Sequence, residues 1–229
     1  MAQKKDVKKE ILMIILAIET TSQGGSLAIQ KGNQIIYQDY FAMRSSHSET
    51  IMPKIDSTLK LFEIDKKELS AVCVSIGPGS FTGCRIGLAT AKGICTGLKI
   101  PLLAFNTLEI LAANIYGTNK RILSILDARM NEIYIAEYDS FLLTIKEPCC
   151  KKYSDIFQGM KGDYICVGDI HLLPNEITNK SLKIIKALPH QNILSAAAMM
   201  SLLDYKNINL VYDKEYIHNI EPFYVRGVN

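Results

Sequence analysis

The sequence predicts an α/β protein of two tandem lobes, each a mixed sheet that opens with three antiparallel strands and carries helices on its faces. Three observations predict this fold. The first half places strand and helix patterns in the order β-β-β-α-β-α-β-α, and the strand pattern then restarts. The length of 229 residues suits one large domain or two of about 100–130 residues. Because Gly117-Thr118-Asn119-Lys120 reads as a boundary, we expect a first lobe over 13–117 and a second, degenerate lobe over 118–229.

The first element follows a basic leader, which we expect to be a disordered extension over 1–12. Lysines there precede the apolar run Ile11–Ile18, a pattern that mimics a secretory signal. The run ends at Glu19 without a small-residue cleavage site, and a membrane-spanning helix needs about 20 apolar residues. It therefore predicts a buried strand over Ile14–Ile18, and we hypothesise that Met13 is an alternative start.

The rest of the first half alternates strands and helices. Strands are predicted at Ser26–Gln30, Ile35–Phe41, Ala71–Ile76 and Leu102–Ala104. Helices are predicted from Ser46 or Ser48 to about Phe62, over Thr82–Leu98 after the glycine-rich turn Gly77–Gly83, and over Leu108–Ile115. Pro53 lies inside the first of these helices, so that helix is expected either to begin late or to kink.

The second half repeats the opening pattern. Strands are predicted at Ile122–Leu126, Ile133–Tyr138, Leu142–Lys146, Tyr164–Val167 and Leu182–Ala187, and a helix is predicted at Ile193–Leu203. Without gaps, Ile18-Glu19-Thr20-Thr21 aligns with Leu126-Asp127-Ala128-Arg129, which suggests a weak internal repeat at an offset of 108 residues.

Composition excludes several classes of function. The chain is 48% hydrophobic and 21% charged, so it can bury a core. Lys and Arg number 26 against 23 Asp and Glu, a net charge of +3, whereas a dedicated nucleic-acid binder is usually far more basic. Its six cysteines include no C-x-x-C pair, which favours reduced thiols in the cytosol. Its four histidines are far apart and form no H-E-x-x-H, so no metal site is predicted.

The sharpest local signal is a glycine-rich segment between a buried strand and a helix. Helix-start N–H groups favour an anion, so one interpretation is a phosphate or carboxylate cradle. The other is a tight strand-to-helix turn capped by Ser80 or Thr82. The segment is not a P-loop, because Cys84 stands where lysine would follow Gly83, and its glycine spacing is one residue too long for the dinucleotide fingerprint. The candidate anion contacts are Gly77, Gly79, Ser80, Thr82, Gly83 and Arg85.

The helix around residues 47–62 carries apolar side chains on more than one face. Ile51, Ile55, Leu59 and Phe62 recur at helical spacing, and Met52 widens the stripe. The helix either faces the core or forms an interface, which Met52 suits because thioethers adapt to a partner surface.

The next helix is rich in small residues, among them Gly87, Gly93 and Gly97. Each glycine in a helix interior costs about 1 kcal/mol relative to alanine, and close approach of another backbone offsets this cost. That neighbour is either the chain's own sheet or another subunit.

These motifs, in chain order, resemble those of the TsaB family, also called YeaZ, the non-catalytic relatives of the tRNA threonylcarbamoyltransferase TsaD. The matching stretches are Ile15-Leu16-Ala17-Ile18-Glu19-Thr20-Thr21, Ser46-His47-Ser48-Glu49, Ser75-Ile76-Gly77-Pro78-Gly79-Ser80-Phe81-Thr82-Gly83, Leu126-Asp127-Ala128-Arg129 and Glu221-Pro222-Phe223-Tyr224-Val225-Arg226. They cover nearly the whole chain after Met13, and residues 139–210 match only loosely.

The resemblance implies two actin-like, RNase H-like lobes and a cytoplasmic, non-catalytic subunit. Its role would be to bind and activate TsaD in making N6-threonylcarbamoyladenosine at position 37 of tRNAs that read codons beginning with A. In such systems TsaD performs the transfer and holds the metal, TsaE is the ATPase, and tRNA is contacted only through the complex. TsaB binds TsaD through first-lobe helices, and forms a homodimer through the same surface when alone. Carried over by position, the partner-binding residues are His47, Ile51, Met52, Ile55, Leu59, Phe62, Ile86, Thr90, Gly93 and Gly97.

The competing interpretation is an autonomous actin-like ATP-dependent phosphotransferase. In such enzymes a carboxylate at a strand end and a glycine soon after it hold the metal and phosphates, and Glu19 and Asp127 occupy such places. The residues after Asp127 include no early glycine, so their side chains would obstruct a phosphate. We expect Arg129 to pair with a nearby acid instead. No cofactor is therefore predicted, apart from weak nucleotide contact at the subunit boundary through Gly77–Gly83.

The glycoprotease activity often ascribed to this superfamily has no metal pair or activated nucleophile here.

The resemblance favours the interface interpretation of the first helix, with Ile51, Ile55 and Leu59 exposed. Ile55→Asp is therefore expected to weaken homodimer and TsaD binding and to leave the lobes folded. Burial of such side chains is worth roughly 1.5–3 kcal/mol each, while association costs on the order of 4–15 kcal/mol, so both helices are needed.

Overall fold

The computed structural model describes residues 12–42, 47–174, 180–206 and 210–225. Ten strands are described in it, at Ile14–Glu19 (β1), Gly24–Lys31 (β2), Gln34–Ala42 (β3), Leu69–Ser75 (β4), Leu102–Phe105 (β5), Arg121–Arg129 (β6), Glu132–Tyr138 (β7), Thr144–Lys152 (β8), Gly162–Gly168 (β9) and Leu182–Lys186 (β10). The helices are His47–Leu61 (α1), Phe81–Leu98 (α2), Thr107–Ala113 (α3), Ala196–Lys206 (α4) and Lys214–Asn219 (α5).

The strands form two five-stranded sheets with the same topology. The first has the order β3-β2-β1-β4-β5 and the second β8-β7-β6-β9-β10. In each, the first three strands pair antiparallel and the last two join in parallel. The offset of 108 residues carries β1 onto β6 and β2 onto β7, so the weak repeat in the sequence is confirmed as a structural repeat. These are the two actin-like, RNase H-like lobes that the motifs implied.

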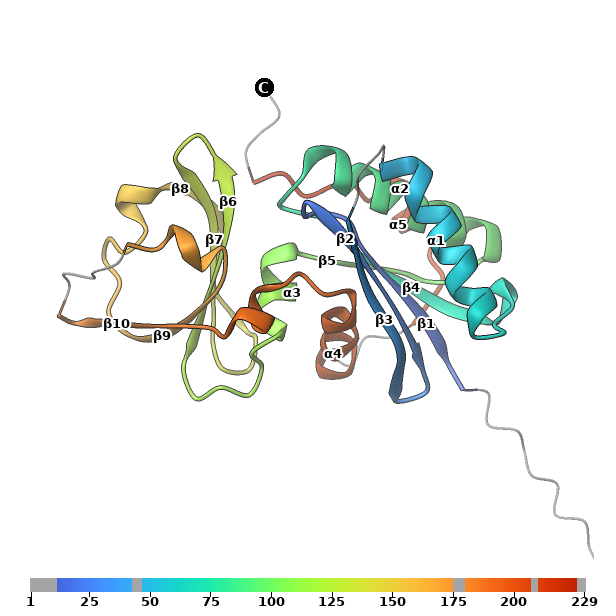
Figure 1. The fold of residues 1–229 in the computed structure, drawn as a ribbon, viewed down its shortest axis with the longest axis horizontal. Helices are drawn as coiled ribbons and strands as arrows, with labels where there is room; N and C mark the ends of the chain where they lie inside the picture. The colour runs from blue at the N-terminus through green and yellow to red at the C-terminus, as the bar shows by residue number, and fades with distance from the viewer. Residues whose placement is uncertain (1–11, 43–46, 175–179, 207–209, 226–229) are drawn as a thin grey trace, which may run out of the picture.

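The helices lie in two places relative to the sheets. α1, α2 and α5 cover the outer face of the first sheet, while α3 and α4 lie between the two sheets (Figure 1). α3 packs mainly on the second sheet, through β6 and β7, and α4 packs on the first, through β1 and β2. Each lobe therefore ends in a helix that lies against the other lobe.

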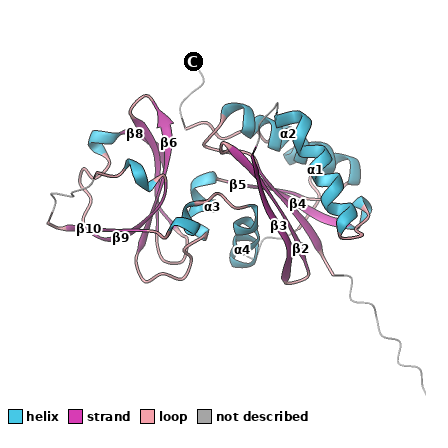
Figure 2. Ribbon diagram, viewed as in Figure 1, coloured by secondary structure: helices cyan, strands magenta, loops and turns pink. Residues whose placement is uncertain are grey.

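The second lobe differs from the first in the connections after its third and fourth strands. Where the first lobe has α1 and α2, the described part of the second has only the short 3₁₀ turns Tyr153–Asp155 and Ile170–Leu172. Figure 2 shows the result, with long helices over the first sheet and mostly strands and loops around the second. The predicted degeneracy of the second lobe thus corresponds to missing helices rather than to missing strands.

Three clusters of buried apolar side chains hold the lobes together. One lies between the first sheet and α1 and α2, one beneath the outer loops of the second sheet, and the largest between the two sheets around α3 and α4. The largest joins Ala17 and Ala28 of the first sheet to Ile122 and Val167 of the second. The two lobes therefore share a core.

Most predicted elements agree with the structure, with four differences. The strand predicted at Leu142–Lys146 runs from Thr144 to Lys152 as β8. α1 is one continuous helix with Pro53 inside it, so the expected late start is wrong. The helix predicted from Ile193 begins at Ala196, and α5 had not been predicted. The chain after residue 195 contacts the first sheet and α2.

The predicted division of the chain into two lobes at residue 117 stays a prediction. The predicted disordered leader, 1–12, lies outside the described residues except for Leu12. No helix in the described ranges is long and apolar enough to cross a membrane.

Candidate functional site

The glycine-rich segment forms a tight turn that packs against the end of β1. Ser80 caps α2 by accepting a hydrogen bond from the Gly83 N–H at 3.1 Å, and its own N–H donates to the Thr21 carbonyl at 2.7 Å. A Cβ at Gly77, Gly79 or Gly83 would lie 2.7, 2.4 or 1.9 Å from a backbone carbonyl oxygen of Phe223, Thr21 or Thr20. These glycines therefore permit close packing within the chain, which favours the tight-turn interpretation.

The two other predicted anion contacts lie on α2. Thr82 is exposed in the first turn of the helix. The Arg85 guanidinium lies 3.8 Å from the Phe81 ring centroid, and its Nε donates to the Tyr224 hydroxyl at 3.0 Å. Phe81 in turn stacks on Tyr224 at 5.3 Å. Arg85 thus fastens the C-terminal segment to α2.

Glu19 is fully buried at the end of β1 and is held by its own loop. Its carboxylate accepts hydrogen bonds from the Thr21 N–H at 2.5 Å, the Thr21 hydroxyl at 2.6 Å and the Ser22 hydroxyl at 3.2 Å. Burial raises the pKa of Glu19, and these hydrogen bonds oppose the rise. With its oxygens directed at the β1–β2 loop, Glu19 shapes that loop rather than offering a ligand to a metal.

A cleft of about 860 Å³ opens between the lobes beside this turn. Its walls are the β1–β2 loop, the start of α2 and the ends of β6 and β9. The lining residues are Thr21, Ser22, Gln23, Gly79, Ser80, Phe81, Leu126, Asp127, Ala128, Arg129, Tyr134, Asp169 and His171.

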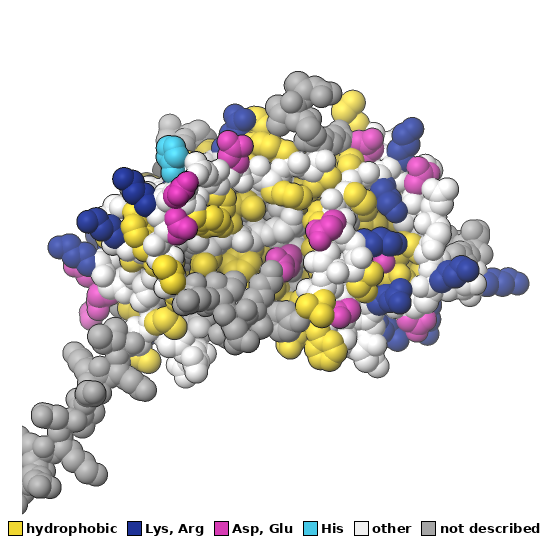
Figure 3. Space-filling model, turned by 180° about the vertical axis from the view of Figure 1, so that it is seen from behind, with side chains coloured by type: hydrophobic (Ala, Val, Ile, Leu, Met, Phe, Trp, Pro, Cys, Tyr) yellow, Lys and Arg dark blue, Asp and Glu magenta, His cyan; other side chains and the backbone are white. Residues whose placement is uncertain are grey.

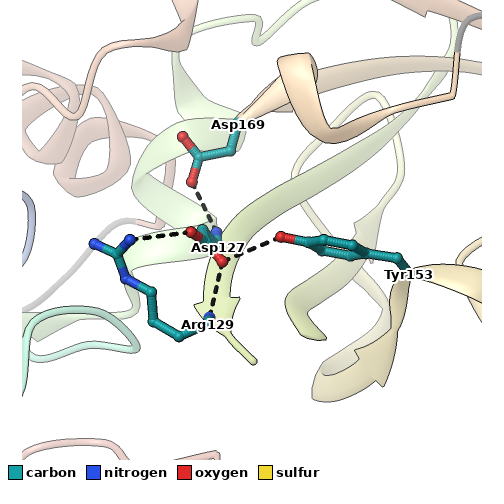
Figure 4. Close-up of polar contacts among 4 residues, drawn as sticks. All are labelled: Asp127, Arg129, Tyr153 and Asp169. Carbon is teal, nitrogen blue, oxygen red and sulfur yellow. Dashed lines mark hydrogen bonds and ion pairs between the residues drawn. The ribbon is translucent and has the colours of Figure 1, made fainter. Parts of the chain in front are cut away.

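Asp127 and Asp169 lie on the second-lobe wall of the cleft and take part in a small network of hydrogen bonds (Figure 4). Asp169 accepts the Asp127 N–H at 2.7 Å, and Asp127 accepts the Arg129 N–H at 2.8 Å and the Tyr153 hydroxyl at 3.2 Å. The Arg129 guanidinium lies 3.4 Å from the same Asp127 carboxylate, so its predicted pairing with an acid is confirmed. Partial burial and the hydrogen bond to Asp127 raise the pKa of Tyr153.

The chain itself occupies the places where a phosphate would approach the first lobe. The carbonyl oxygens of Thr21 and Phe223 lie over Gly79 and Gly77, and the β1–β2 loop holds the Glu19 carboxylate. In the second lobe the Asp127 carboxylate is paired with Arg129. Within the described ranges, no three His, Cys, Asp or Glu side chains are arranged to hold a metal ion. Burial also raises the pKa of the Cys84 thiol to about 12, so this cysteine beside the glycine turn is not an activated nucleophile.

A second, apolar hollow of about 410 Å³ lies between α1 and α2 on the outer side of the first lobe. We call it the α1–α2 groove. Its lining residues are Met52, Ile55, Asp56, Leu59, Lys66, Leu69, Ala89, Thr90, Gly93, Ile94, Gly97 and Leu98. One wall carries the exposed side chain of Met52, and the other is formed by glycines with open space above them at positions 93 and 97.

The structure places the predicted partner-binding residues unevenly. Met52, Thr90, Gly93 and Gly97 line the groove and are at least partly exposed. Ile86 packs against the core, and Phe62 makes an edge contact with Tyr37 at 5.5 Å. His47 opens α1, but its side chain lies outside the described part of the chain.

The interpretation of Ile51, Ile55 and Leu59 as exposed is wrong. Their exposures are 1, 1 and 2%, because they face β1 and β2 in the core of the first lobe. Ile55 and Leu59 reach only the floor of the groove. The ordinary core-facing interpretation of the α1 stripe therefore holds, and Ile55→Asp would damage the lobe itself.

Sequence reasoning missed several residues of both sites. Ala89, Ile94 and Leu98 complete the groove on the helix that carries Gly93 and Gly97. Ala89 precedes Gly93 by four residues, Ile94 precedes Gly97 by three and Leu98 follows Ile94 by four, so helical spacing would have identified them. Asp169 follows the buried strand β9, as Asp127 follows the buried core of β6, and that pattern would have flagged it.

Comparison with known proteins identifies relatives of the whole arrangement. Residues 42–185 match the family model described as TsaD: tRNA N6-adenosine threonylcarbamoyltransferase. The chain is 34% identical over 165 residues to the tRNA threonylcarbamoyladenosine biosynthesis protein TsaB of Buchnera aphidicola, covering 68% of this chain and 78% of that one. It is 36% identical to TsaB of Bacillus subtilis over 126 residues, 55% of each chain. The match thus spans about half the length of the latter relative.

A third curated relative aligns along most of the chain, and solved structures share its fold. The TsaB protein of Haemophilus influenzae is 25% identical over 94% of both chains. A structure described as YeaZ from Pseudomonas aeruginosa superposes with a TM-score of 0.74 at 20% identity, over 93% of this chain and all of that one. At this identity the likeness shows the fold.

Proposed function

The chain belongs to the TsaB family of tRNA threonylcarbamoyladenosine biosynthesis proteins, and we propose that it is a non-catalytic subunit that binds and activates TsaD. The modification is N6-threonylcarbamoyladenosine at position 37 of tRNA. The protein acts in the cytoplasm beside TsaE, contacts tRNA only through the complex, and forms a homodimer when TsaD is absent.

The α1–α2 groove is the observation that carries this proposal. It presents Met52, Ile94 and Leu98 around a wall of small residues, where a helix of another protein can approach closely. Ion pairing of Lys66 with Asp56 at 2.8 Å places a polar rim beside this apolar centre. An apolar centre within a polar rim is typical of protein interfaces.

The charge distribution supports the proposal that this chain contacts tRNA only as part of the complex and not by itself. On the face shown in Figure 3, basic and acidic side chains both lie over each lobe, and the net charge of the chain is only +3. A protein that binds RNA on its own is usually far more basic, because its lysines and arginines must neutralise the phosphates.

The autonomous phosphotransferase has less support. The interlobe cleft is large enough for a nucleotide, but backbone carbonyl groups of the chain itself fill the glycine turn beside it, and Arg129, paired with Asp127, follows that carboxylate where a phosphate-binding glycine would be needed. Calorimetric titration of the isolated chain with Mg-ATP separates the two functions, because saturable binding with turnover would favour the phosphotransferase.

The test of the proposal combines capture with activity. TsaD of the same organism is co-purified with this chain, and tRNA modification is assayed with and without the chain. Gly93→Leu fills the groove where nothing lies within 4 Å, so the fold is retained and capture is expected to weaken roughly tenfold, or about 1.4 kcal/mol.

Thr96→Leu is the matched control, because Thr96 is exposed on the same helix but does not line the groove. It should capture TsaD like the unchanged chain. Unchanged capture by Gly93→Leu, or full modification activity without this chain, contradicts the proposal.

A further inference from the structure

One side chain just after β1 packs directly against α2. Thr20 is fully buried, and its hydroxyl donates to the Gly83 carbonyl oxygen at 2.8 Å. Its side chain fits into a notch formed by Gly83 and Gly87, which are four residues apart and therefore lie on the same face of the helix.

The notch has no spare room. A Cβ at Gly87 would lie 2.2 Å from the Thr20 hydroxyl oxygen, and a Cβ at Gly83 would lie 1.9 Å from the Thr20 carbonyl oxygen. Ordinary contacts begin near 3.4 Å, so alanine at position 87 would push the helix about 1 Å from the sheet unless Thr20 gave way. At Gly87 the obstacle is a removable side-chain atom, and at Gly83 it is backbone.

The same helix forms one wall of the α1–α2 groove further along. Gly93 and Gly97 follow Gly87 by six and ten residues, so they lie about 9 and 15 Å along the axis. Because an α-helix moves as a rigid rod over such a length, displacement at the notch changes the separation of α2 from α1. Interface cores are packed as densely as protein interiors, so a shift of about 1 Å matters for a partner seated there.

We infer that Thr20 is a positioning residue for partner binding, which sets the width of the α1–α2 groove by seating α2 through the Gly83–Gly87 notch. The inference rests on the proposed function, because it assumes that the groove receives TsaD. The glycines at 83 and 87 thus have a different role from those at 93 and 97: the first pair faces the sheet and the second faces the partner.

A pair of compensating substitutions tests the inference. Gly87→Ala is expected to weaken binding of purified TsaD at least tenfold, at a temperature where circular dichroism shows the variant to be folded. Adding Thr20→Ala removes the hydroxyl that meets the new methyl group and leaves the Thr20 Cβ position at 3.5 Å, an ordinary contact. The double variant should therefore bind within about threefold of the unchanged chain.

Gly83→Ala supplies the unrescued control, because its obstacle is the Thr20 backbone, and Thr20→Ala should not restore its binding. If Gly87→Ala does not fold, the single variant Thr20→Ala tests the inference. It leaves the notch empty, so α2 is no longer held at a fixed distance from the sheet, and the affinity for TsaD should fall several-fold. Wild-type affinity in folded Gly87→Ala, or in Thr20→Ala where Gly87→Ala does not fold, overturns the inference. So does a double variant no tighter than Gly87→Ala.

Failure of the inference is distinguishable from failure of the proposed function. If Gly93→Leu abolishes capture while the notch variants bind normally, the groove is the interface and Thr20 does not position it. If neither Gly93→Leu nor the notch variants alter capture, the groove is not the interface, and both statements are wrong.

Discussion

Glu19 is a carboxylate at a strand end whose side chain lies fully inside the fold. It lies against Thr21, Ser22 and Ser75 with no exposed surface. Burial disfavours its charged form and raises its pKa, which makes it a measurable source of pH dependence.

Glu19→Gln is predicted to remove that dependence. Between the unfolded pKa of about 4.3 and the raised folded pKa, the folded state holds more protons than the unfolded state, so the free energy of unfolding falls as pH rises. The glutamine Oε1 can still accept from Thr21 and does not titrate. In urea denaturation from about pH 4 to about pH 8, the free energy of unfolding of the unchanged chain should fall relative to that of the variant as pH rises. A difference that stays constant over this range contradicts the prediction.

Individual residues of the glycine segment show what sequence can and cannot predict. The presence of a strand, a turn and a capped helix at Ser75–Gly87 followed from glycine placement and from the two candidate caps, Ser80 and Thr82, of which the structure uses Ser80. Whether Gly77 and Gly79 leave room for an anion or for the chain itself depends on what lies opposite. Those neighbours, Thr21 and Phe223, are remote in sequence, so local pattern could not choose between the two.

At the scale of elements, α1 explains why the sequence misjudged exposure. Its apolar positions recur at helical spacing whether the stripe faces a core or a partner, so periodicity alone does not tell the two apart. In the structure Ile51, Ile55 and Leu59 lie on the buried face of α1, and Met52 lies at the groove. The element was therefore predictable, while its division between core and interface required the position of the sheet.

This division yields opposite predictions for two neighbours on α1. Ile55→Ala should lower the free energy of unfolding by about 2–5 kcal/mol, because it opens a cavity in a core position that is 1% exposed. Met52→Ala removes a side chain that is 39% exposed, so stability should change by less than about 0.5 kcal/mol while TsaD capture weakens. Denaturation and capture are measured on both variants. If Ile55→Ala is as stable as the unchanged chain, the prediction that the α1 stripe is buried is wrong. If Met52→Ala captures TsaD as well as the unchanged chain does, Met52 is not part of the interface.

The whole molecule resembles two copies of one lobe, yet the copies are not independent. Strand order and direction are the same in both sheets, which the restart of the sequence pattern anticipated. The crossing of α3 and α4 was not anticipated, because helix patterns carry no information about which sheet a helix will cover. As a consequence Leu108 and Leu111 of α3 are buried in the same cluster as Ile122 of the second sheet and Met199 of α4.

A shared core predicts that the two lobes unfold together. Residues 13–117 alone would expose the face of α3 that packs on β6 and β7, and would lose α4 from the inner face of the first sheet. We expect that segment not to fold, whereas 13–229, truncated only in its leader, should fold like the full chain. Calorimetry of the full chain should give one transition with equal calorimetric and van't Hoff enthalpies. In Leu111→Ala, hydrogen exchange should rise in both sheets, since this fully buried side chain lies where the lobes meet. Two separate transitions, or cooperative unfolding of 13–117 alone, would mean that each lobe is stable without the other and that α3 and α4 only link them.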